Sequence, residues 1–244
     1  MKMFFILFVF GIATLEKTLT PISSCTKGRI TRYTGWENGG SCSLGKHTNA
    51  TGPTYMYPIS PNQALFNEHL QCGICYEIVG PKGTIRARVE NYCPAGDKDP
   101  LCHGDMFHLD IAHNGSKYLM GDGSVANVTF RMVACDFDGN IRIKTGDTAS
   151  AGWYNFVVLD HKIGIRSVRA KEANSNVWNN LIRENANQWT FWLGKQLTFP
   201  ITIEIYSLAG DFVTVKPPEA EANAYYTADG NFKVPDNLWF DVES

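Results

Sequence analysis

Six cysteines lie between residues 42 and 135 of this 244-residue chain, and this cluster limits the possible folds more than any other feature. Six thiols can pair evenly into disulfides and leave Cys25 over. Seven cysteines are also many for a protein of this size in the reducing cytosol. The segment Cys72-Gly73-Ile74-Cys75 has the spacing of a zinc knuckle or a redox pair, but neither a second CxxC nor a matched histidine pair accompanies it. We therefore expect disulfides, and neither a metal nor a cofactor.

The N-terminus indicates secretion, which agrees with an oxidising compartment. An apolar run from Phe4 to Leu15 follows Lys2, and it is shorter than the roughly 20 residues that span a bilayer. We interpret residues 1–20 as a signal peptide. The alternative is an uncleaved membrane anchor, because no clean small-x-small cleavage site follows. Three N-glycosylation triplets also fit a secreted chain; they begin at Asn49, Asn114 and Asn127.

Charge excludes two classes of main partner. A net charge of −2 and a pI near 6.3 provide no excess positive field for phosphates, so neither nucleic acid nor an anionic membrane surface is expected. The aromatic residues are distributed unevenly, with five of the six tryptophans after residue 152. The last cysteine is followed by a small, polar stretch from Lys144 to Gly152. We place a domain boundary there, with domains over 25–145 and 152–244.

Both domains consist of short runs rich in β-branched and aromatic residues, bounded by Gly, Pro or Asn. In the first domain these predict strands of a compact barrel at 83–90, 106–111 and 128–135, and a helix only at 61–70. In the second they predict an antiparallel sandwich with strands at 153–159, 164–170, 189–192, 201–207 and 211–215. The sequence therefore predicts an all-β chain.

Several motifs, taken in order, resemble those of expansins. In the first domain these are Thr31-Arg32-Tyr33, Gly39-Gly40-Ser41-Cys42, Leu70-Gln71-Cys72-Gly73-Ile74-Cys75-Tyr76-Glu77-Ile78, Asn91-Tyr92-Cys93-Pro94, Phe107-His108-Leu109-Asp110 and Val133-Ala134-Cys135. In the second they are Trp153-Tyr154-Asn155-Phe156-Val157-Val158-Leu159 and Phe199-Pro200-Ile201-Thr202-Ile203-Glu204-Ile205. The resemblance covers the chain from about residue 28 to its end.

The resemblance implies a six-stranded double-psi β-barrel, similar to that of family-45 cellulases, followed by an immunoglobulin-like β-sandwich that binds polysaccharide. Expansins loosen cellulose-containing walls without hydrolysing them. The family pattern implies three disulfides: Cys42 with Cys72, Cys75 with Cys135, and Cys93 with Cys102. We accordingly expect a monomer that acts outside the cell or in a cell wall on cellulose or another wall glucan.

The resemblance also suggests a groove with incomplete hydrolytic chemistry. Asp110 matches the general acid of the related cellulases and the essential Asp of expansins. Hydrolysis needs a second carboxyl group, and the cellulases supply it as the Asp of a TRYWD motif, where this chain has Gly35. The other groove residues expected to bind glycan are Thr31, Tyr33, Asn91, Tyr92 and His108. Asn91 replaces a charged Asp of bacterial expansins.

A stacking platform for glucan is expected at the start of the second domain. Trp153 and Tyr154 align with an adjacent tryptophan pair of bacterial expansins, and sugar faces stack on exposed rings. Because adjacent strand residues point to opposite faces, this platform requires a bulge. The third aromatic of the family platform aligns with Ala186, so either Trp192 or Trp178 substitutes for it or one subsite is missing. We assign most other aromatic residues of this domain to its core.

Three functions remain open at this stage. The first is an expansin-like protein that acts on glucan without hydrolysis, which Gly35 favours. The second is a weak endoglucanase with a relocated base; the candidate bases are Glu37, Glu90 and Asp97. The third is a structural matrix protein that only binds glycan.

Overall fold

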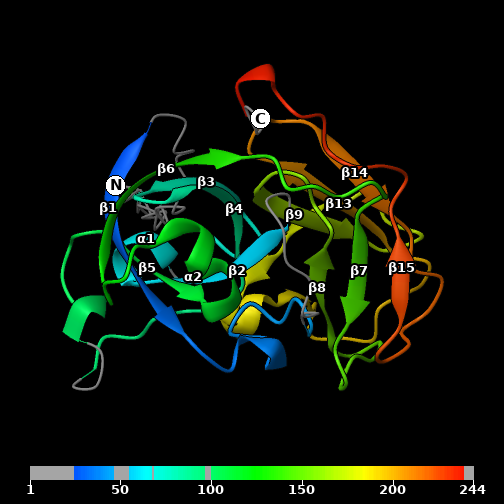
Figure 1. Cartoon of the computed structure of the whole chain (residues 1–244). Coiled ribbons are helices and arrows are strands. Elements are labelled where there is room, and N and C mark those ends of the chain that lie inside the picture. The colour runs from blue at the N-terminus through cyan, green and yellow to red at the C-terminus, as the bar shows by residue number, and fades with distance from the viewer. Residues whose placement is uncertain (1–24, 47–54, 68, 97–99, 239–244) are drawn as a thin grey trace, which may run out of the picture.

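The computed structural model describes residues 25–46, 55–67, 69–96 and 100–238, which form two β domains (Figure 1). The predicted signal peptide, Asn49 and Asp97 lie outside these ranges. Within them, no helix has both the length and the apolar character needed to cross a membrane.

Six strands close the barrel of the first domain in the order β1-β5-β2-β4-β3-β6. Their bounds are β1 Thr26–Tyr33, β2 Met56–Pro61, β3 Cys75–Gly80, β4 Gly83–Val89, β5 His108–Ala112 and β6 Ala126–Val133. The pairs β1–β5 and β2–β4 are parallel and the other neighbours antiparallel. Alternation directs every second side chain inward, so that Leu109 and Ile111 are fully buried on either side of Asp110. The predicted double-psi barrel is confirmed.

The helices of the barrel differ from the prediction. The expected helix at 61–70 is a single turn, α1 Gln63–Phe66, because β2 extends to Pro61 and Asn67 adopts a left-handed φ of 46°. A second helix, α2 His113–Leu119, was not predicted, since its Asn, Gly and Ser are weak helix formers. It forms where a Cβ on Gly115 would lie 2.6 Å from the Tyr57 ring, so close packing on the barrel outweighs propensity. Four single turns add to these helices in the described part of the chain; three are η1 Trp36–Asn38, η2 Pro100–Cys102 and, further along, η4 Asp236–Leu238, and the fourth lies in the sandwich.

Two sheets form the sandwich of the second domain, as predicted. The four-stranded sheet has the order β10-β9-β13-β14, with β9 Ile165–Lys171, β10 Asn179–Asn180, β13 Thr202–Ser207 and β14 Phe212–Val215. The five-stranded sheet has the order β11-β12-β8-β7-β15, with β7 Arg142–Thr145, β8 Tyr154–Leu159, β11 Ile182–Arg183, β12 Trp189–Phe191 and β15 Tyr225–Thr227; η3 Asn185–Asn187 links β11 to β12. Inward-facing residues such as Phe156, Val168 and Ile203 are fully buried between the sheets.

The strand pairing does not follow the predicted domain boundary. The prediction assigned residues 142–145 to the first domain and treated 144–152 as a linker. Residues 142–145 form β7, which pairs with β8, and residues 146–153 connect the two strands as a hairpin. Turn-forming composition is common to linkers and hairpin loops, so it could not distinguish them. That the two domains are separate folding units stays a prediction.

The three disulfides are those implied by the resemblance: Cys42–Cys72, Cys75–Cys135 and Cys93–Cys102. Cys25 is exposed and unpaired in the structure. Each disulfide restricts the unfolded chain and is expected to contribute about 2–4 kcal/mol to stability. All three lie in the barrel part of the chain, and Cys135 is also the point from which the chain leaves for the sandwich.

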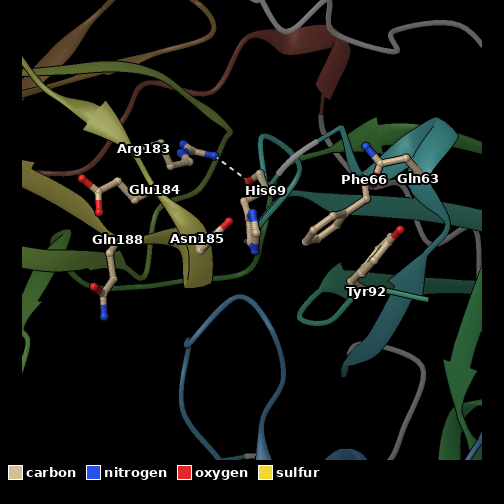
Figure 2. A pocket seen from close by; sticks show the side chains of 8 residues that line it. All are labelled: Gln63, Phe66, His69, Tyr92, Arg183, Glu184, Asn185 and Gln188. Atoms are coloured by element: carbon tan, nitrogen blue, oxygen red, sulfur yellow. Dashed lines mark hydrogen bonds between the residues drawn. The ribbon is translucent and has the colours of Figure 1, made fainter. Parts of the chain in front are cut away.

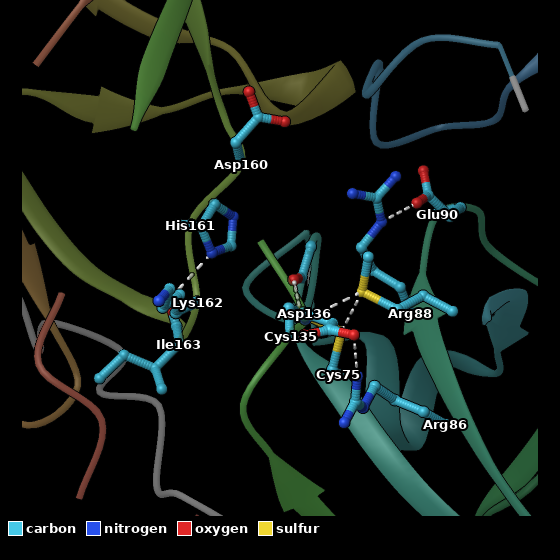
Figure 3. The surroundings of a disulfide bond; sticks show 12 residues. Cys75, Arg86, Arg88, Glu90, Cys135, Asp136, Asp160, His161, Lys162 and Ile163 are labelled. Carbon is cyan, nitrogen blue, oxygen red and sulfur yellow. Dashed lines mark hydrogen bonds and ion pairs between the residues drawn. A yellow bond between two sulfur atoms is a disulfide. The ribbon is translucent and has the colours of Figure 1, made fainter. Parts of the chain in front are cut away.

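The two domains pack through a tight junction beside the Cys75–Cys135 disulfide. Figure 3 shows the segment from Asp160 to Ile163 of the sandwich opposite these cysteines, and the Cys135 amide donates to the Lys162 carbonyl at 2.8 Å. His161 is buried, and its Nδ1 donates to the Ile163 carbonyl at 2.9 Å. Burial lowers the pKa of His161 to about 4, so the ring is neutral at neutral pH.

Gly73 of the CGxC motif is required at this junction for two reasons. It has a left-handed φ of 77°, and a Cβ there would lie 2.4 Å from His161 Nε2. A side chain at this position would therefore strain the backbone and displace the ring that joins the domains.

Gly73→Ala is expected to lower the free energy of unfolding by roughly 2–5 kcal/mol, from the left-handed backbone and the forced contact together. Gly139→Ala is a matched control, because this glycine is exposed and a Cβ there meets nothing within 4 Å. The control should change stability by less than about 0.5 kcal/mol. Urea denaturation of the disulfide-intact proteins measures both; equal stability of the two variants would contradict the described junction.

Candidate functional site

The predicted groove forms where β1 and β5 run parallel. Their register places Thr31 opposite Asp110, 79 residues apart in the sequence. The two side chains hydrogen bond, and Thr31 Oγ1 lies 3.0 Å from Nε2 of the buried His108. A hollow of about 340 Å³ opens here; its lining residues are Thr31, Arg32, Tyr33, Pro100, Leu101, His108 and Asp110. Four of the predicted groove residues are therefore together.

The hydrogen bonds of this cluster show which groups donate and which accept. Arg29 Nε donates to His108 Nδ1 at 3.3 Å, so the imidazole proton belongs on Nε2. Nε2 then donates to the Thr31 hydroxyl, which in turn donates to Asp110 Oδ1. This arrangement suits an ionised Asp110, because an ionised carboxylate only accepts. Asp110 is half-buried beside the hollow and can accept hydrogen bonds from a bound molecule.

Tyr33 lines the same hollow as a hydrogen-bond donor. Burial raises the pKa of its hydroxyl to about 12, and the nearby carboxylates Glu90 and Asp110 raise it further. Tyr33 is therefore protonated at neutral pH and cannot serve as a base there.

Gly35, which stands where the related cellulases have their catalytic base, lies on the surface. Gly35 is exposed, has a φ of 84° and precedes η1, and a Cβ there would meet nothing within 4 Å. Of the two candidate bases that are described, Glu37 is exposed on η1, and Glu90 is buried and paired with Arg88. Among the described residues that line the hollow, Asp110 alone carries a carboxylate. The second carboxyl group that hydrolysis needs is not supplied by this lining.

Asn91 and Tyr92 do not join the other predicted groove residues. Asn91 Oδ1 accepts hydrogen bonds from both the amide and the hydroxyl of Ser41 at 2.8 Å, so it holds the Gly39–Cys42 loop. Tyr92 lines a different pocket, between the domains. The motif predicted these two residues in the groove because sequence order cannot show which way a loop side chain turns.

The predicted stacking platform is wrong for Tyr154. Trp153 is 39% exposed, whereas Tyr154 is fully buried and belongs to the sandwich core. No bulge brings the two rings to one side; ordinary alternation separates them. Trp192 is the actual partner: Phe191 pairs with Tyr154, so the next residues face each other across the strands. The Trp192 side chain is 60% exposed, and its ring lies 6.2 Å from that of Trp153 at 50°.

One group of metal-ligand types lies at the groove. Ligand atoms of Cys93, Cys102 and His108 are within 4.8 Å of one another. The two sulfurs are joined in a disulfide and are not thiolate ligands while it is intact. That the protein binds no metal and no cofactor stays a prediction.

The predicted glycosylation sites differ in accessibility. Asn127 is exposed on β6, whereas Asn114 is half-buried at the start of α2. Asn49 lies outside the described residues. Glycosylation at all three stays a prediction.

Both domains match models of known protein families. The model of the expansin N-terminal domain matches residues 1–124, and that of the expansin-like protein middle domain matches residues 134–233. The chain therefore belongs to the expansin-like family.

Individual relatives agree with this assignment. Expansin-like protein 2 of Dictyostelium discoideum is 30% identical over 90% of this chain, and expansin-like protein 5 of the same organism is 24% identical over 91%. The chain spans 53% of the first relative's length and 92% of the second's. The crystal structure of Clavibacter michiganensis expansin matches with a TM-score of 0.70 at 19% identity, over 87% of this chain and all of that one. A variant of that expansin was crystallised in complex with cellohexaose and matches with a TM-score of 0.65.

Stability measurements should separate the exposed ring from the buried one. Tyr154→Ala is expected to cost about 3–5 kcal/mol, because it leaves a cavity between the sheets. Trp153→Ala should cost less than this, because its ring is 39% exposed and its removal leaves no enclosed cavity. Thermal or urea unfolding measures both. A larger loss for Trp153→Ala than for Tyr154→Ala would show that the two orientations are reversed.

Proposed function

We propose that this is a secreted expansin-like protein that binds cellulose or a related β-glucan and loosens contacts between wall polysaccharides without hydrolysis. The observation that carries the proposal is the pairing of an exposed Trp153–Trp192 platform with a groove whose described lining has one carboxylate, Asp110. The cellohexaose complex of the Clavibacter relative supports a β-glucan as the ligand.

The two parts suit different tasks. Exposed indole rings stack on sugar faces and retain the protein on a neutral polymer, for which its small net charge is suitable. In the groove, Asp110 can accept hydrogen bonds from sugar hydroxyls, and Tyr33 can donate one. Such bonds compete with those that hold neighbouring glucan chains together. Exchanging them separates chains without breaking a covalent bond.

Secretion belongs to the same proposal. It is supported by the apolar N-terminal run, the three disulfides and the exposed Asn127 triplet. We expect a monomer outside the cell or in a wall, with a membrane contact only if the N-terminal segment remains uncleaved.

Binding, cutting and loosening can be measured on matched samples. We expect wild-type protein to be retained on insoluble cellulose, to release no reducing sugar and to weaken a stretched cellulose network. Asp110→Asn should remain bound but lose the weakening, because its groove no longer presents a full carboxylate. Trp153→Ala should be retained less. The matched controls are Asp138→Asn, an exposed loop carboxylate, and Phe212→Ala, an exposed ring on the other sheet.

The other two functions give different results. Sugar release that Asp110→Asn abolishes would identify an endoglucanase with a relocated base. Retention on cellulose without weakening of the network would identify a structural glycan-binding protein. Either result would contradict the proposal.

A further inference from the structure

A pocket of about 750 Å³ lies between the two domains, outside the groove and the tryptophan pair. The barrel contributes Gln63, Phe66, His69 and Tyr92, and the sandwich contributes Arg183, Glu184, Asn185 and Gln188. Figure 2 shows Phe66 and Tyr92 on one side of this junction pocket and the β11–β12 segment on the other. Its volume is within the range of sites that hold small ligands.

Tyr92 presents a supported ring to the junction pocket. It is half-buried and stacks on the buried Phe66, with ring centres 4.8 Å apart and planes at 22°. Phe66 therefore fixes the orientation of the Tyr92 ring before any ligand arrives. A fixed ring beside a cavity lined by polar side chains is the kind of surface on which a sugar stacks.

The charges of the junction pocket favour a neutral ligand. Arg183 is directed at the protein: it donates to the carbonyls of His69 and Ile165 at 2.8 and 3.4 Å, and its guanidinium lies 4.6 Å from the Trp189 ring. The exposed charged group in the lining is the Glu184 carboxylate, which disfavours anionic ligands. Gln63, Asn185 and Gln188 supply amides that both donate and accept, as sugar hydroxyls require.

Hydrogen bonds between the domains hold the two walls in place. The Ala186 amide donates to His69 Nε2 at 3.3 Å, and Asn187 Nδ2 donates to the Cys42 carbonyl at 3.1 Å. Ala186 has a left-handed φ of 58° and lies where the resemblance leads one to expect the third platform aromatic. In this chain that segment binds the barrel instead of offering a ring.

The junction pocket lies between the two parts of the proposed site. On the sandwich side, Gln188 accepts from Asn155 of β8 at 3.4 Å, and Asn155 is two residues from Trp153, which directly precedes that strand. On the barrel side, Tyr92 precedes Cys93, whose sulfur is 3.8 Å from Asp110 Oδ2.

We propose that the junction pocket is a subsite for a neutral β-glucan, in which Tyr92 of the barrel supplies the third stacking ring in place of Ala186 and Gln63, Asn185 and Gln188 bind sugar hydroxyls. A glucan chain bound by the groove and by the tryptophan pair passes through this subsite. The inference rests on the proposed function, because the identity of the sugar comes from it.

Calorimetric titration of the full-length secreted protein with cellohexaose tests this subsite. The double variant Gln63→Ala/Asn185→Ala removes one exposed amide from each wall and should weaken binding roughly three- to tenfold. Tyr92→Ala should weaken it by a similar factor through lost stacking, and Tyr92→Phe should retain most of the affinity. Phe212→Ala, on the other sheet, should bind as wild type does.

The outcomes separate this inference from the proposed function. If Trp153→Ala weakens cellohexaose binding while the double variant and Tyr92→Ala bind as wild type does, the junction pocket is not a subsite and the inference fails alone. If the wild-type protein does not bind cellohexaose, or Trp153→Ala has no effect, the proposed function fails. If Tyr92→Ala does not fold, the double variant decides, because its two side chains are exposed.

Discussion

The parallel pairing of β1 with β5 is the interaction on which the rest of the barrel depends. It joins segments far apart in the sequence and leaves β1 to pair with β6 on its other side, which closes the sheet. The same register sets Thr31 opposite Asp110 and brings His108 within reach. The same strand register therefore closes the barrel and forms the groove. A slip of one residue would direct Asp110 into the core.

The junction between the domains fixes the second half of the site relative to the first. His161 packs on Gly73, and the Cys135 amide binds the Lys162 carbonyl directly after the barrel ends. Buried side chains of both domains form one continuous hydrophobic cluster. This contact is more extensive than a flexible linker would provide, so the groove and the tryptophan pair are held in one defined arrangement.

Sequence predicted the features that follow from pairing and periodicity. The cysteine motifs specified the three disulfides through the family pattern, and the β-rich runs identified most of the strands. Errors arose where tertiary packing decides. Alternation buried Tyr154 against the expectation from motif alignment, and contact with Tyr57 made a helix from the weak helix formers around Gly115. The sequence named Trp192 or Trp178 as a substitute aromatic, but it could not choose between them, because the register of β8 with β12 that places Trp192 beside Trp153 is visible only in the folded sheet.

The junction pocket could not be predicted from sequence at all. It needs residues from α1, from the Tyr92 loop and from the segment between β11 and β12, and no local pattern shows that these meet. Ala186 illustrates the difficulty: in sequence it reads as the loss of an aromatic, whereas in the structure its backbone amide joins the domains.

A crystal structure of the wild-type protein with cellohexaose tests the central claim most directly, namely that both domains hold one intact glucan chain. We predict an uncleaved hexaose stacked on Trp153 and Trp192 and extending toward Asp110. Shortened sugars on either side of Asp110, or a hexaose bound away from both tryptophans, would contradict the account.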